Sequence, residues 1–384
     1  MTRITDDWIT LPATQAVCAA LTDAGSEALF VGGCVRNALL GQVVSDIDIA
    51  TDARPDRVVA LAKEAGLKAI PTGIDHGTIT VVSDGVPHEV TTFRRDVETD
   101  GRRAVVAFSD NVEEDAARRD FTMNALYARP DGSVLDPLNG LPDLQARRVR
   151  FIGSAEARIR EDYLRSLRYF RFHAWYGDAD MGFDADALSA IAGNLDGLTG
   201  LSRERVGAEL LKLLGAPDPA PSVATMRQTG VLAQILPGAD DRALAILVKL
   251  EGYAGATPDP IRRLAAIAAP DVAATLRLSR AQMQRLTRMR DEAAGSAGVA
   301  ELGFRYGAEG GLHETLLRCA FLEQPWSPEL AQALETGANA RFPIRAQDLI
   351  PEFTGAALGE KLAQLEALWI ASDFTMTRDE LLAK

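Results

Sequence analysis

The sequence has few of the residues that characterise secreted, zinc-bound or membrane-spanning proteins. Only three cysteines occur in 384 residues, and Cys18, Cys34 and Cys319 lie far apart. Cysteines so few and so scattered predict neither a disulfide framework nor a zinc site. No apolar run of about 18 residues is present, and the first residues lack the basic and apolar stretches of a signal peptide. We therefore expect a cytoplasmic protein without a membrane span.

Positive charge is also in short supply, because 41 basic residues face 54 acidic ones and the net charge is −13. This balance disfavours indiscriminate binding to nucleic acid, since phosphates attract cationic surfaces. The average conceals one basic stretch, residues 147–171, where eight arginines stand against three acidic residues. A local charge of +5 on an acidic chain is compatible with a selective site for RNA or a nucleotide.

The order of the predicted elements indicates a mixed α/β region followed by helices. Residues 1–27 have the pattern of one amphipathic helix, with Leu11, Val17 and Leu21 as its apolar positions. Further along the chain we expect strands at 29–31, 47–50, 78–82 and 86–92, and helices at 34–40 and 56–65. From about residue 140 the apolar residues recur at helical spacing, with proline and glycine clusters between the segments. The length suggests two or three domains.

Two aspartates at the start of the second predicted strand, one just before it and one within it, are the first candidates for chemistry. Side chains alternate across a strand, so Asp46 and Asp48 are expected on one face. Magnesium prefers oxygen ligands and is commonly held by one or two carboxylates together with substrate phosphates. A short Asp-x-Asp pattern alone is more often a pair of solvated acids, so its functional interpretation depends on the residues that precede it.

A glycine turn precedes these aspartates. Gly32 and Gly33 lie between a predicted strand and a helix, where the chain can approach a phosphate closely and the first helical N–H groups are free. Arg36 follows in the first turn of that helix and is a candidate phosphate ligand. A glycine turn, an arginine on the next helix and paired aspartates on the next strand together favour nucleotide binding.

These segments resemble the signature of the class II tRNA nucleotidyltransferase and bacterial poly(A) polymerase family. The residues that carry the resemblance are 32–37 (GGCVRN) and 46–48 (DID). The family usually has aspartate where this chain has Asn37, which leaves the role of that position open. The resemblance implies an α/β head with the DNA polymerase β-like nucleotidyltransferase fold, followed by an all-α neck, body and tail. It further implies catalysis with two Mg²⁺ ions on Asp46 and Asp48.

Residues 118–125 (RRDFTMNA) match a second motif of this family. The resemblance makes Arg119, Asp120 and Asn124 nucleotide-binding residues, with Asp120 acting on the sugar. The strand predicted at 86–92 carries Glu89, a candidate third carboxylate that serves the metals or accepts the hydroxyl proton. Both histidines near this strand, His76 and His88, are interpreted as structural.

Residues 161–165 (EDYLR) match the EDxxR motif, which the family carries on a helix and uses in place of a nucleic-acid template. By this resemblance Asp162 and Arg165 pair with the base edge of CTP or ATP. The chemistry is sound, because carboxylates accept from exocyclic amines and arginine donates to ring nitrogens and carbonyls. Glu161, Arg168 and Arg171 complete the predicted nucleotide-binding set, the two arginines reaching toward phosphate or RNA.

The resemblance implies a nucleotidyltransferase head at 1–140, a neck at 141–215 and a tRNA-binding body and tail at 216–384. It also implies an activity, the addition of CMP, CMP and AMP to the 3′ end of tRNA from CTP and ATP with release of pyrophosphate. Residues 93–108, rich in arginine and aspartate, resemble the loop associated with the switch from C to A addition. Oligomeric state is not predicted.

Three alternatives stay open. A poly(A) polymerase shares all these motifs, although the net charge and the absence of a basic C-terminal extension disfavour it. An enzyme that adds only CC or only A is the second. The third is a catalytically inactive RNA-binding protein, which the intact Asp46, Asp48, Arg119, Asp162 and Arg165 disfavour. None of the four histidines is followed by aspartate, so no His-Asp phosphohydrolase dyad is expected.

Overall fold

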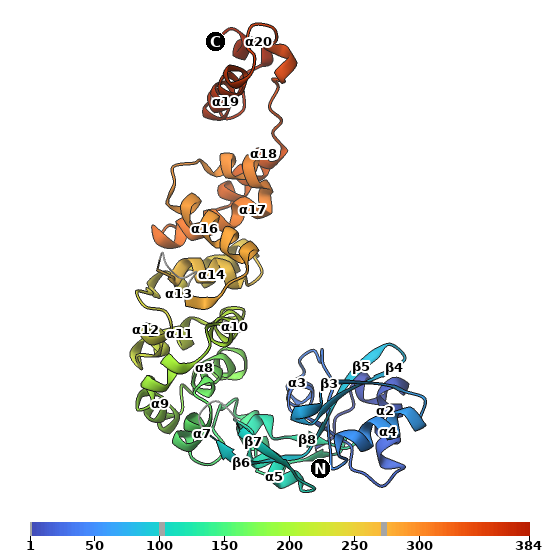
Figure 1. The fold of residues 1–384 in the computed structure, drawn as a ribbon. Coiled ribbons are helices and arrows are strands. Elements are labelled where there is room, and N and C mark those ends of the chain that lie inside the picture. Colours follow the sequence, from blue (N-terminus) through green and yellow to red (C-terminus); the bar gives the residue numbers. More distant parts are fainter. Residues whose placement is uncertain (1, 100–103, 270–274) are drawn as a thin grey trace. The chain divides into compact units, whose positions relative to one another are not determined.

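The computed structural model describes residues 2–99, 104–269 and 275–384, and it divides into two compact units (Figure 1). The first unit is Met1–Ile235 and the second is Leu236–Lys384. All strands belong to the first unit, whereas the second is built from helices in its described part. This arrangement is the expected α/β head followed by helices.

A mixed sheet of seven strands, in the order β3-β4-β5-β2-β1-β8-β9, organises the head. Only β2 and β5 run parallel, and the other neighbours are antiparallel. The strands are β1 Leu29–Val31, β2 Asp48–Thr51, β3 Lys68–Gly73, β4 Thr78–Ser83, β5 Val86–Thr92, β8 Tyr127–Ala128 and β9 Val134–Leu135. Alternating burial along β4 leaves one face of that strand for packing.

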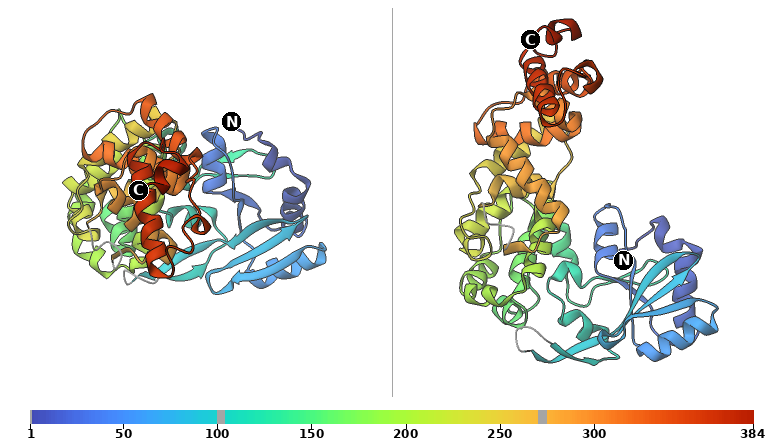
Figure 2. Two further views of the ribbon diagram at one scale, coloured as in Figure 1. Left: turned by 90° about the horizontal axis from the view of Figure 1, so that it is seen from above. Right: turned by 45° about the horizontal axis from the view of Figure 1, so that its top comes forward.

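The head helices cover the sheet and supply its turns. They are α1 Asp7–Thr10, α2 Pro12–Thr22, α3 Gly33–Leu39, α4 Pro55–Glu64, η1 Ile74–His76, α5 Val112–Ala117 and η2 Thr122–Asn124. Contacts of α2 and α4 with each other and with β4 and β5 place both helices on one face of the sheet (Figures 1 and 2). His88 is buried beneath α2, where its Nε2 lies 3.1 Å from the hydroxyl of Thr14.

Two expectations for the head need correction. Residues 1–27 form two helices, because Leu11 precedes Pro12 and takes an extended conformation, and Leu11 is 40% exposed. Strand β2 begins at Asp48, so Asp46 lies before the strand and side-chain alternation does not set its direction. The buried Ile47 still separates the two aspartates.

A separate two-stranded sheet follows β5. It consists of β6 Arg94–Thr99 and β7 Ala104–Phe108, which pair antiparallel. The loop predicted at 93–108 is therefore a hairpin in its described part, and residues 100–103 at its centre lie outside the described residues. The hairpin starts beside the buried Phe93, a member of the head core with Leu29, Val31 and Tyr127.

Helices complete the first unit after residue 140. They are α6 Leu141–Gln145, α7 Ala155–Glu161, α8 Leu164–Tyr176, α9 Ala185–Ala192, η3 Leu195–Gly200, α10 Arg203–Leu214, α11 Ala220–Gln228 and α12 Val231–Ile235. Aromatic contacts join α8 to the head, since the ring of Phe121 lies 4.9 Å from that of Phe172 and 6.2 Å from that of Tyr169.

The EDxxR segment does not lie on one helix, which corrects the sequence-based expectation. Helix α7 ends at Glu161, Asp162 has extended backbone angles, and α8 begins at Leu164. The carboxylate of Asp162 accepts a hydrogen bond from the backbone N–H of Leu164 at 3.1 Å. A local hydrogen bond of this kind, from the backbone to an aspartate side chain, competes with the continuation of the preceding helix.

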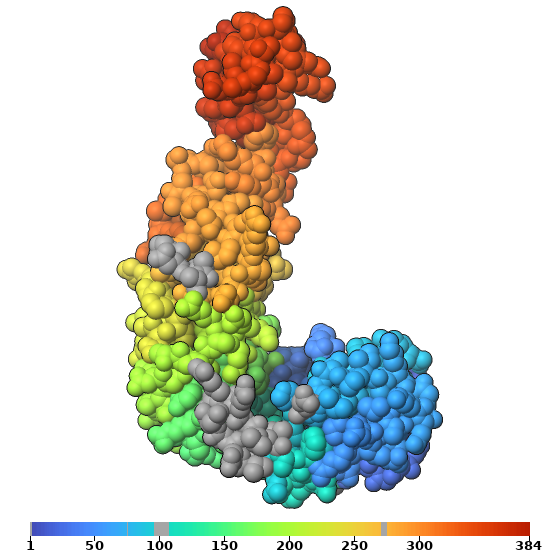
Figure 3. All heavy atoms as spheres, in the orientation of Figure 1, coloured from blue at the N-terminus to red at the C-terminus, as the bar shows by residue number. Residues whose placement is uncertain are grey.

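The second unit consists of stacked helices, whose atoms form successive layers from yellow to red in Figure 3. They are α13 Arg242–Ala254, α14 Pro260–Ile267, α16 Arg280–Ala294, α17 Val299–Phe321, α18 Pro328–Asn339, η4 Ala346–Asp348, α19 Ala356–Ala371 and α20 Arg378–Leu382. Across the described residues, none of the helices has the length and apolar character needed to span a lipid bilayer.

Candidate active site

A cavity of about 450 Å³ within the first unit gathers most of the predicted site residues. It is lined by the glycine turn, the 118–124 segment and the start of α8, including Gly32, Gly33, Arg36, Asp48, Arg119, Asp120, Asn124, Asp162, Arg165 and Arg168. Asp46, Glu89, Glu161 and Arg171 are not in its wall. A larger cavity of about 820 Å³, between residues 150–156 and α9, contains none of the predicted site residues.

Sequence analysis missed other residues of the same wall, namely Arg94, Arg118, Leu164, Phe172 and Arg205. Arg118 stands inside a recognised motif and could have been selected. Arg94 comes from the segment interpreted as a loop and Arg205 from the predicted neck, and their proximity depends on the tertiary structure.

The acidic edge of the site is built by the parallel pairing of β2 with β5. Asp48 is in register with Glu89, and the exposed Asp46 lies two residues earlier. Burial raises the pKa of Asp48 to about 6, and the neighbouring charges of Glu89 and Asp46 add to this effect. A divalent cation bound beside Asp48 would relieve this repulsion.

Protein side chains alone do not complete a metal site. Among the described residues, no group of three His, Cys, Asp or Glu side chains could hold a metal ion. One or two carboxylates completed by substrate phosphates is the usual arrangement for magnesium. The residues present therefore fit a metal that binds together with a nucleotide.

Gly32, which precedes α3, lies next to the guanidinium of Arg119. Its φ is +70°, a conformation that residues other than glycine rarely adopt. A Cβ at this position would lie 3.5 Å from Nη1 of Arg119. The guanidinium of Arg119 thus faces the glycine turn, where a triphosphate could reach both.

A buried carboxylate, that of Asp115, fixes the position of the Arg119 side chain. Its Nη2 donates to Asp115 at 2.9 Å, and its Nε donates to the hydroxyl of Tyr127 at 3.1 Å. Burial alone would raise the pKa of Asp115, but the charges of Arg119 and Arg118 outweigh it and lower the pKa to about 2. Asp115 is therefore ionised at neutral pH and orients both arginines.

Arg36 is only 6% exposed and joins the head to α8. Its guanidinium lies 4.0 Å from the ring centre of Tyr176 and donates to that residue's hydroxyl at 2.8 Å. It also donates to the side-chain oxygens of Asn37 and Asn124. Most of its donors are thus engaged within the protein, and Asn37 has a defined contact where the family usually has aspartate.

Asp120 and Arg168 form a second internal pair in the wall. The carboxylate of Asp120 accepts from Nε of Arg168 at 2.7 Å, from Nδ2 of Asn124 at 2.9 Å and from the backbone N–H of Phe121 at 2.9 Å. Arg168 also lies 5.4 Å from the ring centre of Phe172. In this arrangement Asp120 holds Asn124 and Arg168 in place. To bind the sugar of a nucleotide, Asp120 has to exchange one of these hydrogen bonds for a bond to the sugar.

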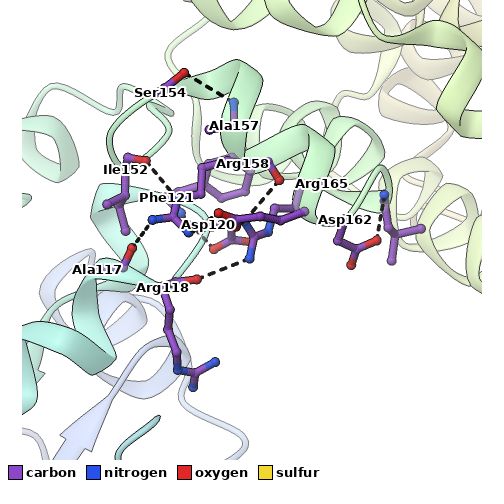
Figure 4. A network of polar contacts seen from close by, with 12 residues as sticks. Ala117, Arg118, Asp120, Phe121, Ile152, Ser154, Ala157, Arg158, Asp162 and Arg165 are labelled. Atoms are coloured by element: carbon purple, nitrogen blue, oxygen red, sulfur yellow. Dashed lines mark hydrogen bonds and ion pairs between the residues drawn. The ribbon is translucent and has the colours of Figure 1, made fainter. Parts of the chain in front are cut away.

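Asp162 lies in the break between α7 and α8, and Arg165 follows in the first turn of α8 (Figure 4). Arg165 donates to the backbone carbonyl of Arg118 at 3.3 Å and forms an ion pair with Glu161, which also binds Arg158 at 2.8 Å. Asp162 accepts from the backbone N–H of Leu164 and pairs with Arg205 of α10 at 2.6 Å. Glu161 thus orients Arg165 from outside the cavity.

Arg171 lies outside the cavity and pairs with Glu209 of α10 at 2.6 Å. Its side chain is 15% exposed, and its guanidinium is 4.7 Å from the ring centre of Phe172. These contacts join α8 to α10, and a role of Arg171 toward phosphate or RNA stays a prediction.

The fold and this site define a class of protein. A glycine turn, paired aspartates beside a third carboxylate and an arginine-lined cavity are the features of a nucleotidyltransferase head. Residues 28–150 match the family described as "Poly A polymerase head domain". Residues 180–242 match the one described as "Probable RNA and SrmB- binding site of polymerase A".

Relatives along nearly the whole chain identify the family more closely. The mitochondrial CCA tRNA nucleotidyltransferase 1 of Mus musculus is 32% identical over 372 residues, covering 93% of this chain and 86% of the mouse protein. That of Danio rerio is 34% identical, with the same coverage. The crystal structure of the Bacillus stearothermophilus CCA-adding enzyme in complex with CTP is 31% identical, with a TM-score of 0.69, over 94% of this chain and 92% of that one. The chain therefore belongs to the family of CCA tRNA nucleotidyltransferases.

Proposed function

We propose that this protein adds CMP, CMP and AMP to the 3′ end of tRNA, using CTP and ATP and releasing pyrophosphate. The observation that carries this function is the cavity that brings Asp48, the glycine turn, Arg119 and the Asp162–Arg165 pair together. Relatives named for CCA addition match the chain over 93% of its length, which favours this activity over poly(A) synthesis.

Magnesium binding at Asp46 and Asp48 belongs to this proposal. Two bound Mg²⁺ ions would activate the attacking 3′-hydroxyl and stabilise the leaving oxygen of pyrophosphate. Glu89 stands beside Asp48 and helps to concentrate negative charge there. Gly32 and Gly33 allow the triphosphate to approach α3, and Arg119 balances the negative charge of the phosphates. Arg36 stabilises the cavity wall.

Base selection rests on Asp162 and Arg165 in the proposed mechanism. A carboxylate accepts from the exocyclic amine that cytosine and adenine share, and the guanidinium donates to the adjacent ring nitrogen. Uracil and guanine present a carbonyl where the amine would be and an N–H beside it, so both contacts become repulsive. The cavity wall between the head and α8 is stabilised by Asp120, Asn124 and Arg168.

The domain roles are proposed in the same way. The head (1–140) carries the chemistry, the neck (141–215) selects the nucleotide, and the body and tail (216–384) bind tRNA by shape and backbone contacts. A cytoplasmic location is part of the proposal, and cell fractionation tests it directly, since some relatives are named as mitochondrial.

The test is an extension assay on a tRNA that lacks its CCA end, with Mg²⁺ and with CTP alone, ATP alone or both. We expect two additions with CTP and a halt after three when both nucleotides are present. The variant Asp46→Ala/Asp48→Ala serves as the inactive control.

Each alternative has its own outcome in this assay. A long ladder with ATP alone identifies a poly(A) polymerase. Extension that never passes two C residues, or that occurs only on a substrate already ending in CC, identifies a partial enzyme. No extension by a folded protein leaves an RNA-binding function only.

A further inference from the structure

Arg205 occupies a place in the cavity wall that its sequence context did not suggest. It lies in the first turn of α10, 43 positions after Asp162, and its Nη2 donates to Oδ2 of Asp162 at 2.6 Å. Both side chains line the same cavity as Arg165. A residue of α10 thus contacts the carboxylate that is proposed to read the base.

The position of Asp162 explains why it needs such a partner. Asp162 has extended backbone angles in the break between α7 and α8, so neither helix fixes its side chain. Its Oδ1 accepts from the backbone N–H of Leu164, and its Oδ2 accepts from Arg205. These two contacts together set the plane of the carboxylate and leave lone pairs on both oxygens for a further donor.

Other cations near Asp162 are already engaged. Arg165 binds Glu161 and the backbone carbonyls of Arg158 and Arg118. Arg168 is paired with Asp120. Among the contacts described for Asp162, Arg205 is therefore the one that supplies a guanidinium to its carboxylate.

A contribution to folding stability alone does not explain the ion pair of Arg205 with Asp162. The side chain of Arg205 is 41% exposed and that of Asp162 is 29% exposed. Ion pairs with this much solvent contact contribute little to folding free energy. Where discrimination between substrates depends on one hydrogen-bond acceptor, however, an ion pair that fixes the direction of this acceptor can have a large effect.

We propose that Arg205 is a positioning residue that holds the carboxylate of Asp162 toward the base and thereby sets the preference for CTP and ATP over UTP and GTP. The inference rests on the proposed function of the site. When the guanidinium is removed, the carboxylate keeps its contact with Leu164 but is free to turn, so a carbonyl at the base edge is no longer repelled. Arg205 acts through Asp162 and does not itself need to touch the nucleotide.

The experiment compares wild type with Arg205→Met, Arg205→Lys and the control Arg203→Met in the full-length protein. Arg203 is an exposed residue of the same helix end and does not line the cavity. The values of kcat and KM for CTP and UTP are measured on tRNA lacking CCA. We expect the ratio of kcat/KM for CTP to that for UTP to fall about tenfold or more in Arg205→Met, because one charge-assisted contact orients the acceptor. Arg205→Lys retains part of the ratio and Arg203→Met retains all of it.

The combination with Asp162→Asn shows whether Arg205 acts through Asp162. If it does, adding Arg205→Met to Asp162→Asn leaves the CTP-to-UTP ratio unchanged, because the two effects are not additive. Full additivity overturns the proposal. So does an equal loss for all nucleotides accompanied by a lower Tm, which is the result expected of a structural residue.

Failure of this inference and failure of the proposed function are distinguishable. If wild type extends no RNA, the proposed function fails, and the same CTP-to-UTP ratio is then measured by equilibrium binding of the two nucleotides. An unchanged binding ratio in Arg205→Met overturns the inference in that case also. If wild type adds CCA and Arg205→Met keeps its full discrimination, only the inference fails.

Discussion

At the scale of single residues, paired charges build a cationic cavity on an acidic protein. Arg119 is balanced by Asp115, Arg168 by Asp120 and Arg205 by Asp162. Each carboxylate fixes the direction of a guanidinium and balances its charge. Cationic groups therefore line the cavity without a large net positive charge. This explains how a chain with a net charge of −13 contains an arginine-rich site.

The first residue-scale prediction concerns Asp48. Asp48→Asn removes a charge from the carboxylate group that we propose holds magnesium, and we expect nucleotide addition to fall at least about 1000-fold, because metal charge stabilisation contributes several kcal/mol to such reactions. Single-turnover extension rates measure the effect. Asp56→Asn, at an exposed position in the first turn of α4, is the matched control and should keep full activity.

A pH-dependent prediction follows from Asp115. Its folded pKa of about 2 lies below its ordinary value of 3.8, so its charged form stabilises the fold at every pH above the ordinary value. Asp115→Asn should lower the unfolding free energy at pH 7 by about 2 kcal/mol. The difference from wild type should be constant above about pH 5 and should shrink as the pH falls below about 4.

Denaturant unfolding of both proteins between pH 3 and pH 8 measures this difference. Asp110→Asn is the control, since Asp110 is 78% exposed in its pair with Arg54 and should change stability by no more than about 0.5 kcal/mol. A difference that grew toward low pH would contradict the assignment of Asp115 as the ionised partner.

At the scale of elements, two local arrangements place the site residues. The parallel pairing of β2 with β5 sets Asp48 beside Glu89. The break between α7 and α8 presents Asp162 and Arg165 to the cavity. Sequence patterns predicted β1, the β4–β5 hairpin and α4 well, because periodicity and turn residues are local signals. They did not predict the helix break, since the hydrogen bond from the backbone N–H of Leu164 to Asp162 competes with a segment that otherwise favours helix.

The break depends on close packing against η3, which leads to an element-scale prediction. A Cβ on Gly197 would lie 2.0 Å from Cε1 of Tyr163, the residue between Asp162 and α8. Gly197→Ala should therefore displace the ring of Tyr163, lower stability by about 1 to 3 kcal/mol and weaken base selection. Thermal unfolding and the CTP-to-UTP ratio are the two measurements.

Gly252→Ala is the control for this substitution. Gly252 lies within α13, and a Cβ there would meet no atom within 4 Å. Alanine at this position should be neutral or stabilising by up to about 1 kcal/mol, because glycine is a poor helix former. Equal destabilisation by the two substitutions would show that the contact with Tyr163 is unimportant.

At the scale of the whole molecule, the chain divides into a unit with the cavity and a unit of helices. All residues that line the cavity of about 450 Å³ belong to Met1–Ile235. The second unit has its own buried contacts, such as the pairs of Glu251 with Arg262 and Arg263, and a small core around Trp369. Each unit therefore has interactions that stabilise it independently of the other.

A prediction for the fragment 1–235 follows from this division. The fragment should bind CTP and ATP with affinities within about threefold of the full-length protein, because the cavity is complete within it. It should extend tRNA far more slowly, since we propose that the rest of the chain binds the RNA. Equilibrium binding and extension assays measure the two properties, and a fragment that folds but binds no nucleotide would contradict the prediction.

The sequence by itself determined the class of fold, the order of the motifs and most residues of the cavity. It could do so because the glycine turn, the paired aspartates and the two arginine motifs are contiguous segments whose chemistry depends on neighbouring residues. The tertiary structure alone decided that Arg94 and Arg205 enter the wall, that Arg171 faces Glu209, and that Glu161 supports Arg165 from outside. These contacts join residues of separate elements or depend on a helix break, and local spacing does not encode such distances.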